Sequence, residues 1–153
     1  MNDDPVSLGA LGLDTFAPYL MNRIMGRYNS ALRDEVAALG LTTPKLRALA
    51  VLSVHNGILI RELAVYAVVQ QSTLSRALNG LENDGLIRRQ SDETDGRAFH
   101  VFLTDAGHAA HTRLWPHMAR ASEAMFKDIS RDERTALVGT LQKMLRNIRK
   151  HDF

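Results

Sequence analysis

Two short segments decide the fold of this chain: Ile60-Arg61-Glu62-Leu63-Ala64-Val65-Tyr66-Ala67-Val68 and Ser72-Thr73-Leu74-Ser75-Arg76-Ala77-Leu78-Asn79-Gly80-Leu81-Glu82-Asn83-Asp84-Gly85. In the first segment, apolar residues recur at i, i+3, i+4, i+7 and i+8, which places them on one face of a helix. The second carries a similar apolar stripe and ends at Gly85, a residue that suits a helix C-terminus. The periodicity breaks only briefly, around residues 69–71. The segments therefore predict two amphipathic helices joined by a tight turn.

The polar face of the second helix carries side chains that suit nucleic acid. Hydroxyl, guanidinium and amide groups stand where an ordinary solvated helix has lysine and glutamate: Ser72, Thr73, Ser75, Arg76 and Asn79. Arginine can bond the O6 and N7 of guanine, asparagine can read adenine, and hydroxyls bond bases or backbone oxygens. We therefore expect these residues to contact double-stranded DNA. In the alternative interpretation, Ser72 or Thr73 only caps the helix and the rest is polar surface.

A β-hairpin is predicted directly after this helix. The segments 86–91 and 98–104 flank a turn-rich stretch that contains Asp95-Gly96, a strong hairpin-turn signal. In the second flank, Phe99, Val101 and Leu103 alternate with other residues as in a half-buried strand. Two helices followed by a hairpin form the layout of a winged helix-turn-helix.

Arginines lie at the base and tip of the predicted wing. Arg97 is expected to enter the minor groove beside the recognition helix, while Arg88 and Arg89 approach phosphates. Alternatively, Arg97 only pairs with Asp95 or Asp92 across the hairpin, and the two roles are compatible.

In order and spacing, these motifs resemble the MarR family of bacterial transcriptional regulators. The resemblance extends from Leu41 to Gly107 and rests on Leu41-Thr42-Thr43-Pro44, Ile60-Arg61-Glu62-Leu63-Ala64, Ser72-Thr73-Leu74-Ser75-Arg76, Leu81-Glu82-Asn83-Asp84-Gly85-Leu86-Ile87, Asp95-Gly96-Arg97 and Leu103-Thr104-Asp105-Ala106-Gly107. It implies a ligand-responsive repressor that binds a pseudo-palindromic operator as a homodimer. Two residues depart from the family pattern: Gly96 replaces the first of two adjacent wing arginines, and Ser75 replaces a threonine of the recognition helix.

Further helices are predicted on both sides of the winged helix. Thr43-Pro44 opens one of them, and Ser130-Arg131-Asp132-Glu133 is a capping box that opens the last. A long helix begins at Thr104-Asp105, and we expect Pro116 to kink or split it. The apolar faces of the outer helices exceed what a compact winged helix can cover. A second copy of the chain is the simplest partner for them.

The whole chain, 1–153, is therefore predicted to form one domain. It is mostly α with a small β-hairpin wing: a winged helix-turn-helix at 41–104, flanked by N- and C-terminal dimerisation helices at 13–40 and 105–150. A length of 153 residues with 45% hydrophobic content suits a single domain with a real core.

Composition narrows the possible functions. The chain has no cysteine, which excludes disulfides, thiolate catalysis and cysteine metal sites. It has no apolar run long enough to span a bilayer, and its start, Met1-Asn2-Asp3-Asp4-Pro5, is acidic, unlike a signal peptide. We expect a cytoplasmic protein that does not contact a membrane. The net charge of +2 says little about partners.

A small-molecule site is implied by the family resemblance. Small aromatic or phenolic effectors bind between the dimer core and the reading head in that family, and the residues expected to line such a pocket are Met21, Met25, Tyr28, His55 and Trp115. The alternative is that these residues at helical spacing belong to the core.

Neither a metal site nor an enzyme is predicted. His108 and His111 are spaced as metal ligands can be, but no third ligand is evident, so we expect neither metal nor cofactor. The sequence has no glycine-rich phosphate loop, nucleophile elbow or metalloprotease motif. The competing function is a winged helix used only for protein contacts, which steep salt dependence and sequence preference in DNA binding would exclude.

Overall fold

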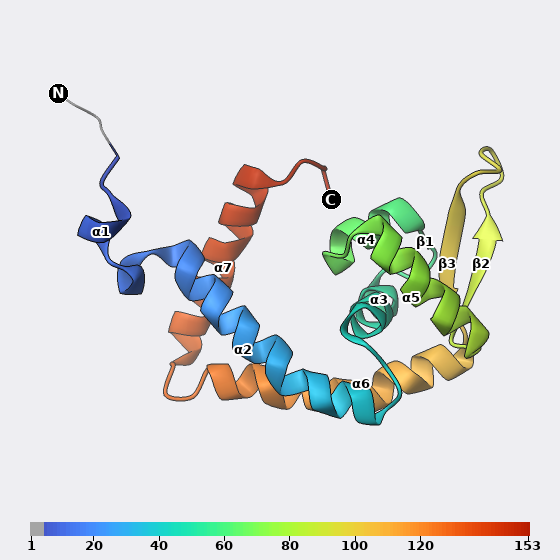
Figure 1. Cartoon of the computed structure of the whole chain (residues 1–153), viewed down its shortest axis with the longest axis horizontal. Coiled ribbons are helices and arrows are strands. Elements are labelled where there is room, and N and C mark those ends of the chain that lie inside the picture. Colours follow the sequence, from blue (N-terminus) through green and yellow to red (C-terminus); the bar gives the residue numbers. More distant parts are fainter. Residues whose placement is uncertain (1–4) are drawn as a thin grey trace.

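The computed structural model describes residues 5–153, and Figure 1 shows a mostly helical chain with one small sheet. In chain order the elements are α1 (Leu8–Leu11), the 3-10 turn η1 (Leu13–Thr15), α2 (Ala17–Ala38), α3 (Thr43–Val54), β1 (Ile58–Leu59), α4 (Ile60–Ala67), α5 (Gln71–Asn83), β2 (Ile87–Ser91), β3 (Phe99–Leu103), α6 (Asp105–Met125) and α7 (Arg131–Ile148). The predicted fold class is confirmed. The acidic start of the chain, residues 1–4, lies outside the described residues.

The sheet is antiparallel, with strand order β1-β3-β2. The hairpin pairs Ile87 with Leu103 and Ser91 with Phe99, as the turn signal predicted. The short strand β1 adds Ile58 opposite Val101 on the other edge of β3. The wing is therefore anchored to the start of α4 and to the end of α5.

The core lies where α3, α4 and α5 meet the sheet. Its central side chains have no solvent exposure: Leu49, Leu52, Leu63, Leu74, Leu78, Leu81 and Val101. Burying one such side chain stabilises a fold by about 1.5–3 kcal/mol. These elements therefore form a rigid unit, which we call the reading head.

The start of α6 is pressed against the reading head. Thr104 caps this helix by accepting a hydrogen bond from the Gly107 N–H at 3.1 Å, and its own hydroxyl donates to the Gly85 carbonyl at 2.6 Å. A Cβ atom at position 107 would lie 2.0 Å from the Leu86 carbonyl oxygen. Only glycine permits this approach, so the junction between the reading head and α6 is fixed.

Pro116 does not split α6, which is one helix from Asp105 to Met125. The sequence predicted a kink or a split at Pro116, and the split is wrong. A proline removes the hydrogen bond to the carbonyl four residues earlier, here that of Thr112. Both Thr112 and Pro116 are exposed, so water can satisfy that carbonyl and the helix continues.

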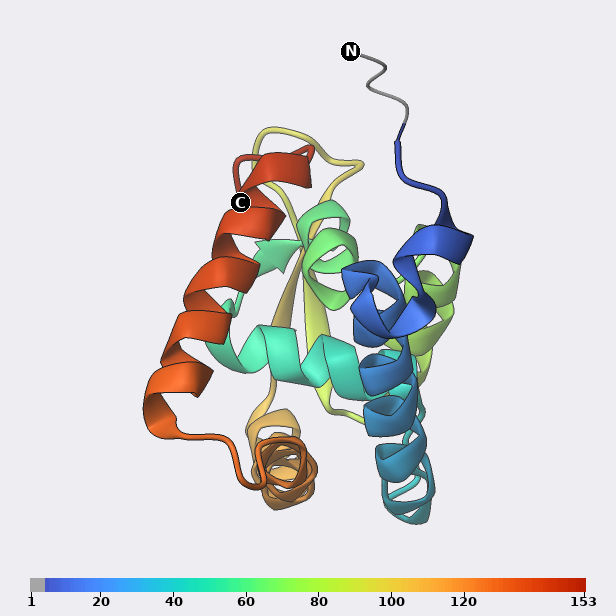
Figure 2. The same cartoon turned by 90° about the vertical axis from the view of Figure 1, so that its left-hand side faces the viewer.

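The outer helices extend away from the reading head. A hydrogen bond between Glu35 and His117 joins α2 to α6, and Arg134 pairs with Glu123 at 2.7 Å across the turn into α7. Figure 2 shows α7 on the opposite side of the molecule from α2, with α3 between them. None of the residues of α7 is buried.

Within residues 5–153, no single helix combines the length and apolar character of a membrane span. Only α2 and α3 taken together have the length and apolar character of such a span, and these two helices are bent by 93° relative to each other.

Candidate nucleic-acid interface

The helix α5 separates its apolar and polar residues cleanly between two faces. Leu74, Ala77, Leu78 and Leu81 are buried in the reading head. The polar residues predicted to contact DNA are all exposed: Ser72, Thr73, Ser75, Arg76 and Asn79. The helix begins at Gln71 after Gln70, so the interpretation of Ser72 or Thr73 as its cap is wrong. The structure thus presents one continuous polar ridge to solvent.

The turn between α4 and α5 sets the angle of this ridge. Val68 adopts a left-handed conformation, with φ of 52°, which is strained for a β-branched residue. Its carbonyl accepts a hydrogen bond from the Arg47 guanidinium at 3.2 Å. A side chain from α3 therefore helps to hold the tight turn.

Arg88 and Arg89, at the base of the wing, have different surroundings. Arg88 is exposed, and its guanidinium lies 4.2 Å from the ring centre of Phe102, where it is oriented by a cation–π contact. Arg89 instead turns toward α5, where its Nε donates to Glu82 at 3.1 Å and its Nη2 donates to the Asn79 side-chain oxygen. The structure therefore places Arg88 toward solvent and Arg89 against α5.

His100, which the sequence analysis did not identify, holds the tip of the wing through two hydrogen bonds. His100 Nδ1 lies 2.8 Å from the Gly57 carbonyl, and Nε2 lies 2.7 Å from the Asp92 carboxylate. Both partners only accept hydrogen bonds, so both contacts form fully when both ring nitrogens donate, and this arrangement favours the positively charged imidazole. No sequence motif marks this contact, because Gly57 is distant along the chain.

The electrostatics of the wing tip follow from these bonds. The hydrogen bond to Asp92 raises the pKa of His100, with a further contribution from the Gly57 carbonyl. Conversely, the His100 hydrogen bond and those from Thr94 and Asp95 lower the pKa of Asp92. The Asp92 carboxylate thus accepts hydrogen bonds from the turn residues Thr94 and Asp95 and also pairs with His100.

Arg97 lies at the exposed tip of the hairpin. Its backbone N–H donates to the Asp95 carboxylate at 3.0 Å. Among residues 5–153, its guanidinium forms no salt bridge. The charge of Arg97 is therefore available to a partner, and the contact with Asp95 is made through the backbone.

The comparisons with known proteins agree with this geometry. The sequence model of the MarR family matches residues 39–98. A MarR-family transcriptional regulator of Silicibacter pomeroyi has a crystal structure with 55% identity and a TM-score of 0.92, covering 97% of this chain and 100% of that one. An HTH-type transcriptional repressor of Mycobacterium tuberculosis is 33% identical, over 74% of this chain and 83% of its own length. The chain belongs to the MarR family and is a DNA-binding transcriptional regulator.

A more distant structure shares the fold. BpsR of Bordetella bronchiseptica, whose DNA binding is regulated by 6-hydroxynicotinic acid, is 22% identical with a TM-score of 0.73, over 83% of this chain and 96% of that one.

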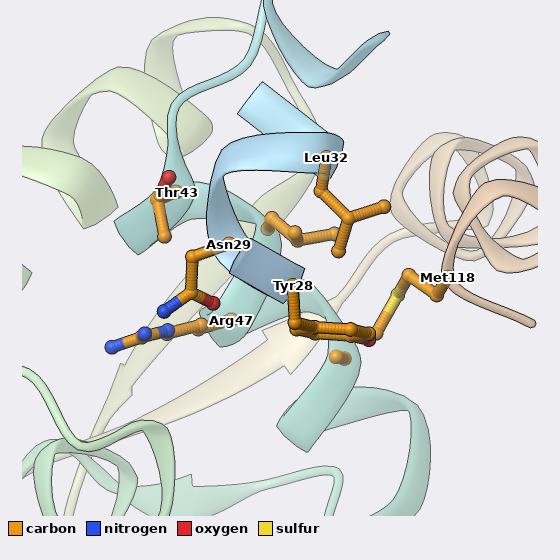
Figure 3. Close-up of a pocket in the computed structure, with 8 residues that line it drawn as sticks. Tyr28, Asn29, Leu32, Thr43, Arg47 and Met118 are labelled. Atoms are coloured by element: carbon orange, nitrogen blue, oxygen red, sulfur yellow. The ribbon is translucent and has the colours of Figure 1, made fainter. Parts of the chain in front are cut away.

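The five residues predicted to line an effector pocket do not come together. Of the five, only Tyr28 lines a small, partly open hollow between α2, α3 and α6. Its other lining residues are Asn29, Leu32, Thr43, Leu46, Arg47, Ala50 and Met118. Figure 3 shows Arg47 and Asn29 on one side of Tyr28 and Met118 on the other.

The other four predicted pocket residues lie elsewhere. The ring of His55 stacks on Tyr66 at 4.7 Å, at the far end of α3. Trp115 is 56% exposed and Met25 is 45% exposed, and Met21 is half-buried on α2. Met25 lies about one turn before Tyr28 on α2, and Trp115 lies about one turn before Met118 on α6, and at those positions the side chains remain in solvent.

His108 and His111 form no metal cluster in the structure. His111 is half-buried against Trp115, with ring centres 6.5 Å apart, and burial lowers its pKa, as does the nearby His108. No group of three or more His, Cys, Asp or Glu residues suited to hold a metal ion occurs in the described part of the chain.

The first prediction is that the wing loosens as the pH rises. Because folding raises the pKa of His100, its stabilising contribution is complete below the ordinary value of about 6.5 and is lost as the pH passes its raised value. The contribution of Asp92, whose pKa is lowered, is complete above about 3.9 and is lost in stronger acid. Hydrogen exchange of the wing amides should therefore accelerate on the alkaline side.

An NMR titration of the His100 ring checks this directly. We expect an apparent pKa above the ordinary histidine value, and a value at or below it would contradict the prediction. The control is His100→Gln, in which the additional, histidine-dependent rise in wing exchange should be absent.

Proposed function

We propose that this regulator is a homodimeric, ligand-responsive repressor that acts in the cytoplasm on a pseudo-palindromic operator. The observation that carries the proposal is the exposed polar ridge of α5 with the basic wing beside it. A ridge of hydroxyl, amide and guanidinium groups fits the major groove, and an arginine-tipped hairpin fits the adjacent minor groove.

Each part of the interface has a distinct role in this proposal. The residues that enter the major groove are Ser72, Thr73, Ser75, Arg76 and Asn79. Arg97 enters the minor groove, and Arg88, oriented by Phe102, contacts a phosphate. The relation to a repressor of Mycobacterium tuberculosis supports the negative sign of regulation.

The second prediction concerns Arg76 on α5 and Arg97 at the tip of the wing. Arg76→Ala should weaken operator binding by about 1–3 kcal/mol and relax the preference at one base position. Arg97→Ala should reduce the slope of log affinity against log salt by about 1 and remove any preference for a narrow A·T minor groove. Selection from a random DNA pool and salt-dependent binding curves measure both effects.

Lys127→Ala is the matched control, because it removes one positive charge in the turn between α6 and α7, away from the reading head. Its operator affinity should match that of the unmodified protein. If Arg76→Ala and Arg97→Ala also bind normally, the proposed interface is wrong.

The homodimer is supported by the apolar surface of the outer helices. The helix α7 exposes Leu137, Leu141, Leu145 and Ile148, although it buries none of its residues within the chain. Near the other end of the chain, Val6, Leu8, Leu11, Leu13 and Leu20 are also exposed. Leaving such side chains in water forgoes about 1.5–3 kcal/mol each, and a second copy related by two-fold symmetry can cover them.

The third prediction is a stable dimer. Sedimentation equilibrium should give twice the chain mass of 17.0 kDa at micromolar concentration. Leu141→Glu combined with Leu145→Glu should dissociate or unfold the protein and abolish tight operator binding. The control Asn147→Asp adds negative charge to α7 without removing an apolar side chain, and it should stay dimeric. A folded monomer of the unmodified chain would contradict the proposal.

The effector site that we propose is the hollow beside Tyr28 and Arg47. Burial raises the pKa of Tyr28, so its hydroxyl keeps its proton and can donate. The Arg47 guanidinium suits an anionic group, and the apolar walls suit an aromatic ring. Regulation of BpsR by 6-hydroxynicotinic acid supports this class of ligand. Since Arg47 also bonds the Val68 carbonyl at 3.2 Å, a ligand that engages it changes the turn before α5.

The fourth prediction is reciprocal coupling between ligand and operator. The test compound is 6-hydroxynicotinate or 4-hydroxybenzoate, whichever raises the melting temperature of the protein. Calorimetric titration should show that operator DNA weakens the binding of this compound by some factor. The compound should weaken the binding of operator DNA by the same factor. Such coupling typically amounts to about 1–3 kcal/mol. Arg47→Ala should reduce the affinity for the anion. Equal ligand affinities with and without operator would show that the compound is not an effector.

A further inference from the structure

The contact between the wing and α5 constrains the side chain of Asn79. Arg89 reaches from β2 to α5, where its Nε is held by the Glu82 carboxylate at 3.1 Å. From that position its Nη2 donates to the side-chain oxygen of Asn79. The Arg89 side chain is only 23% exposed, whereas Asn79 lies on the open ridge. One end of the Asn79 amide is therefore fixed by the wing.

The chemistry of arginine decides which end of the amide that is. A guanidinium has only donors and no acceptor, so the atom that faces Arg89 must be the amide oxygen. The amide nitrogen, with its two N–H groups, lies on the other branch of the side chain. An unconstrained asparagine offers a donor and an acceptor together and can bond adenine at N6 and N7. Here Arg89 already occupies one lone pair of that oxygen and lies on its side of the amide.

We propose that Arg89 orients Asn79 so that it meets DNA as a hydrogen-bond donor. This inference rests on the proposed role of α5 in reading DNA. The complementary group is an acceptor, either on a base edge, such as guanine O6 and N7 or thymine O4, or on a phosphate. The paired donor and acceptor edge of adenine, the partner expected from sequence, is disfavoured, because its N6–H would have to share the oxygen that Arg89 holds. Asn79 is thus a DNA-contacting donor, which sets specificity where its acceptor is a base, and Arg89 is its positioning residue.

The test is Asn79→Asp, which keeps an oxygen for Arg89 but removes both donors. The bond to Arg89 becomes charge-assisted, so the melting temperature should not fall, whereas Asn79→Ala should lower it. Operator affinity should nevertheless fall about tenfold or more in Asn79→Asp, and it should fall in Asn79→Ala as well. A residue that only braced the wing against α5 would tolerate aspartate. Normal operator binding by Asn79→Asp would therefore overturn the proposal.

Asn83→Asp controls for the added charge, because it introduces the same negative charge one turn further along α5. The loss of affinity in Asn79→Asp must exceed the loss in this control at the same salt concentration. Equal losses would mean that general repulsion from phosphates explains the effect, and the inference would fail.

Selection from a random DNA pool distinguishes an acceptor on a base edge from an acceptor on a phosphate. If Asn79 bonds a base, Asn79→Ala should lose a preference for guanine or thymine at one position. If it bonds a phosphate, Asn79→Ala should weaken all sequences equally. Loss of an adenine preference would overturn the proposal.

Arg76→Ala separates this inference from the proposed function. If variants at both Arg76 and Asn79 leave binding unchanged, α5 does not read DNA. If only the Asn79 variants bind operator DNA normally, the proposed role of α5 in reading DNA is retained and the proposed role of Asn79 is wrong.

Discussion

Burial of the apolar stripe of α5 is the constraint on which the rest of this structure depends. Leu74, Leu78 and Leu81 have no solvent exposure, and they fix both the position and the rotation of the helix against α3 and the sheet. Because a helix that buries one face must present the other, the polar ridge is exposed as a direct result. The hydrophobic effect thus stabilises the reading head and orients its binding surface in one step.

The polar contacts around this core set finer features of the same surface. Arg89 holds the base of the wing to α5, and His100 ties its tip to Asp92 and Gly57. These contacts are partly exposed, so each adds little to global stability compared with a buried leucine. Their effect is geometric, since they fix the hairpin beside the ridge and the orientation of an amide on it.

The outer helices serve a different purpose from the reading head. Gly107 allows the start of α6 to approach the reading head closely, while α7 buries no residue within its own chain. A rigid junction at one end and an uncovered apolar face at the other support the proposed dimer, in which a shared helical core sets the distance between two reading heads. The hollow beside Arg47 shares that arginine with the turn before α5.

The sequence by itself determined the elements whose signals are local. The 3.6-residue periodicity of α4 and α5, the Asp95-Gly96 turn and the Ser130 capping box depend only on near neighbours, and all appear in the structure. The exposed positions of Arg76 and Arg97 follow from the same local patterns.

Only the tertiary structure decided which distant groups meet. The pairing of His100 with Gly57, the turn of Arg89 toward Asn79 and the separation of Trp115 from Tyr28 have no sequence signature. Pro116 likewise remains within α6 because its surroundings leave the affected carbonyl to water. The physical reason is common to these cases. Side-chain direction and solvent access are set by how elements pack together, and a linear pattern does not contain that information.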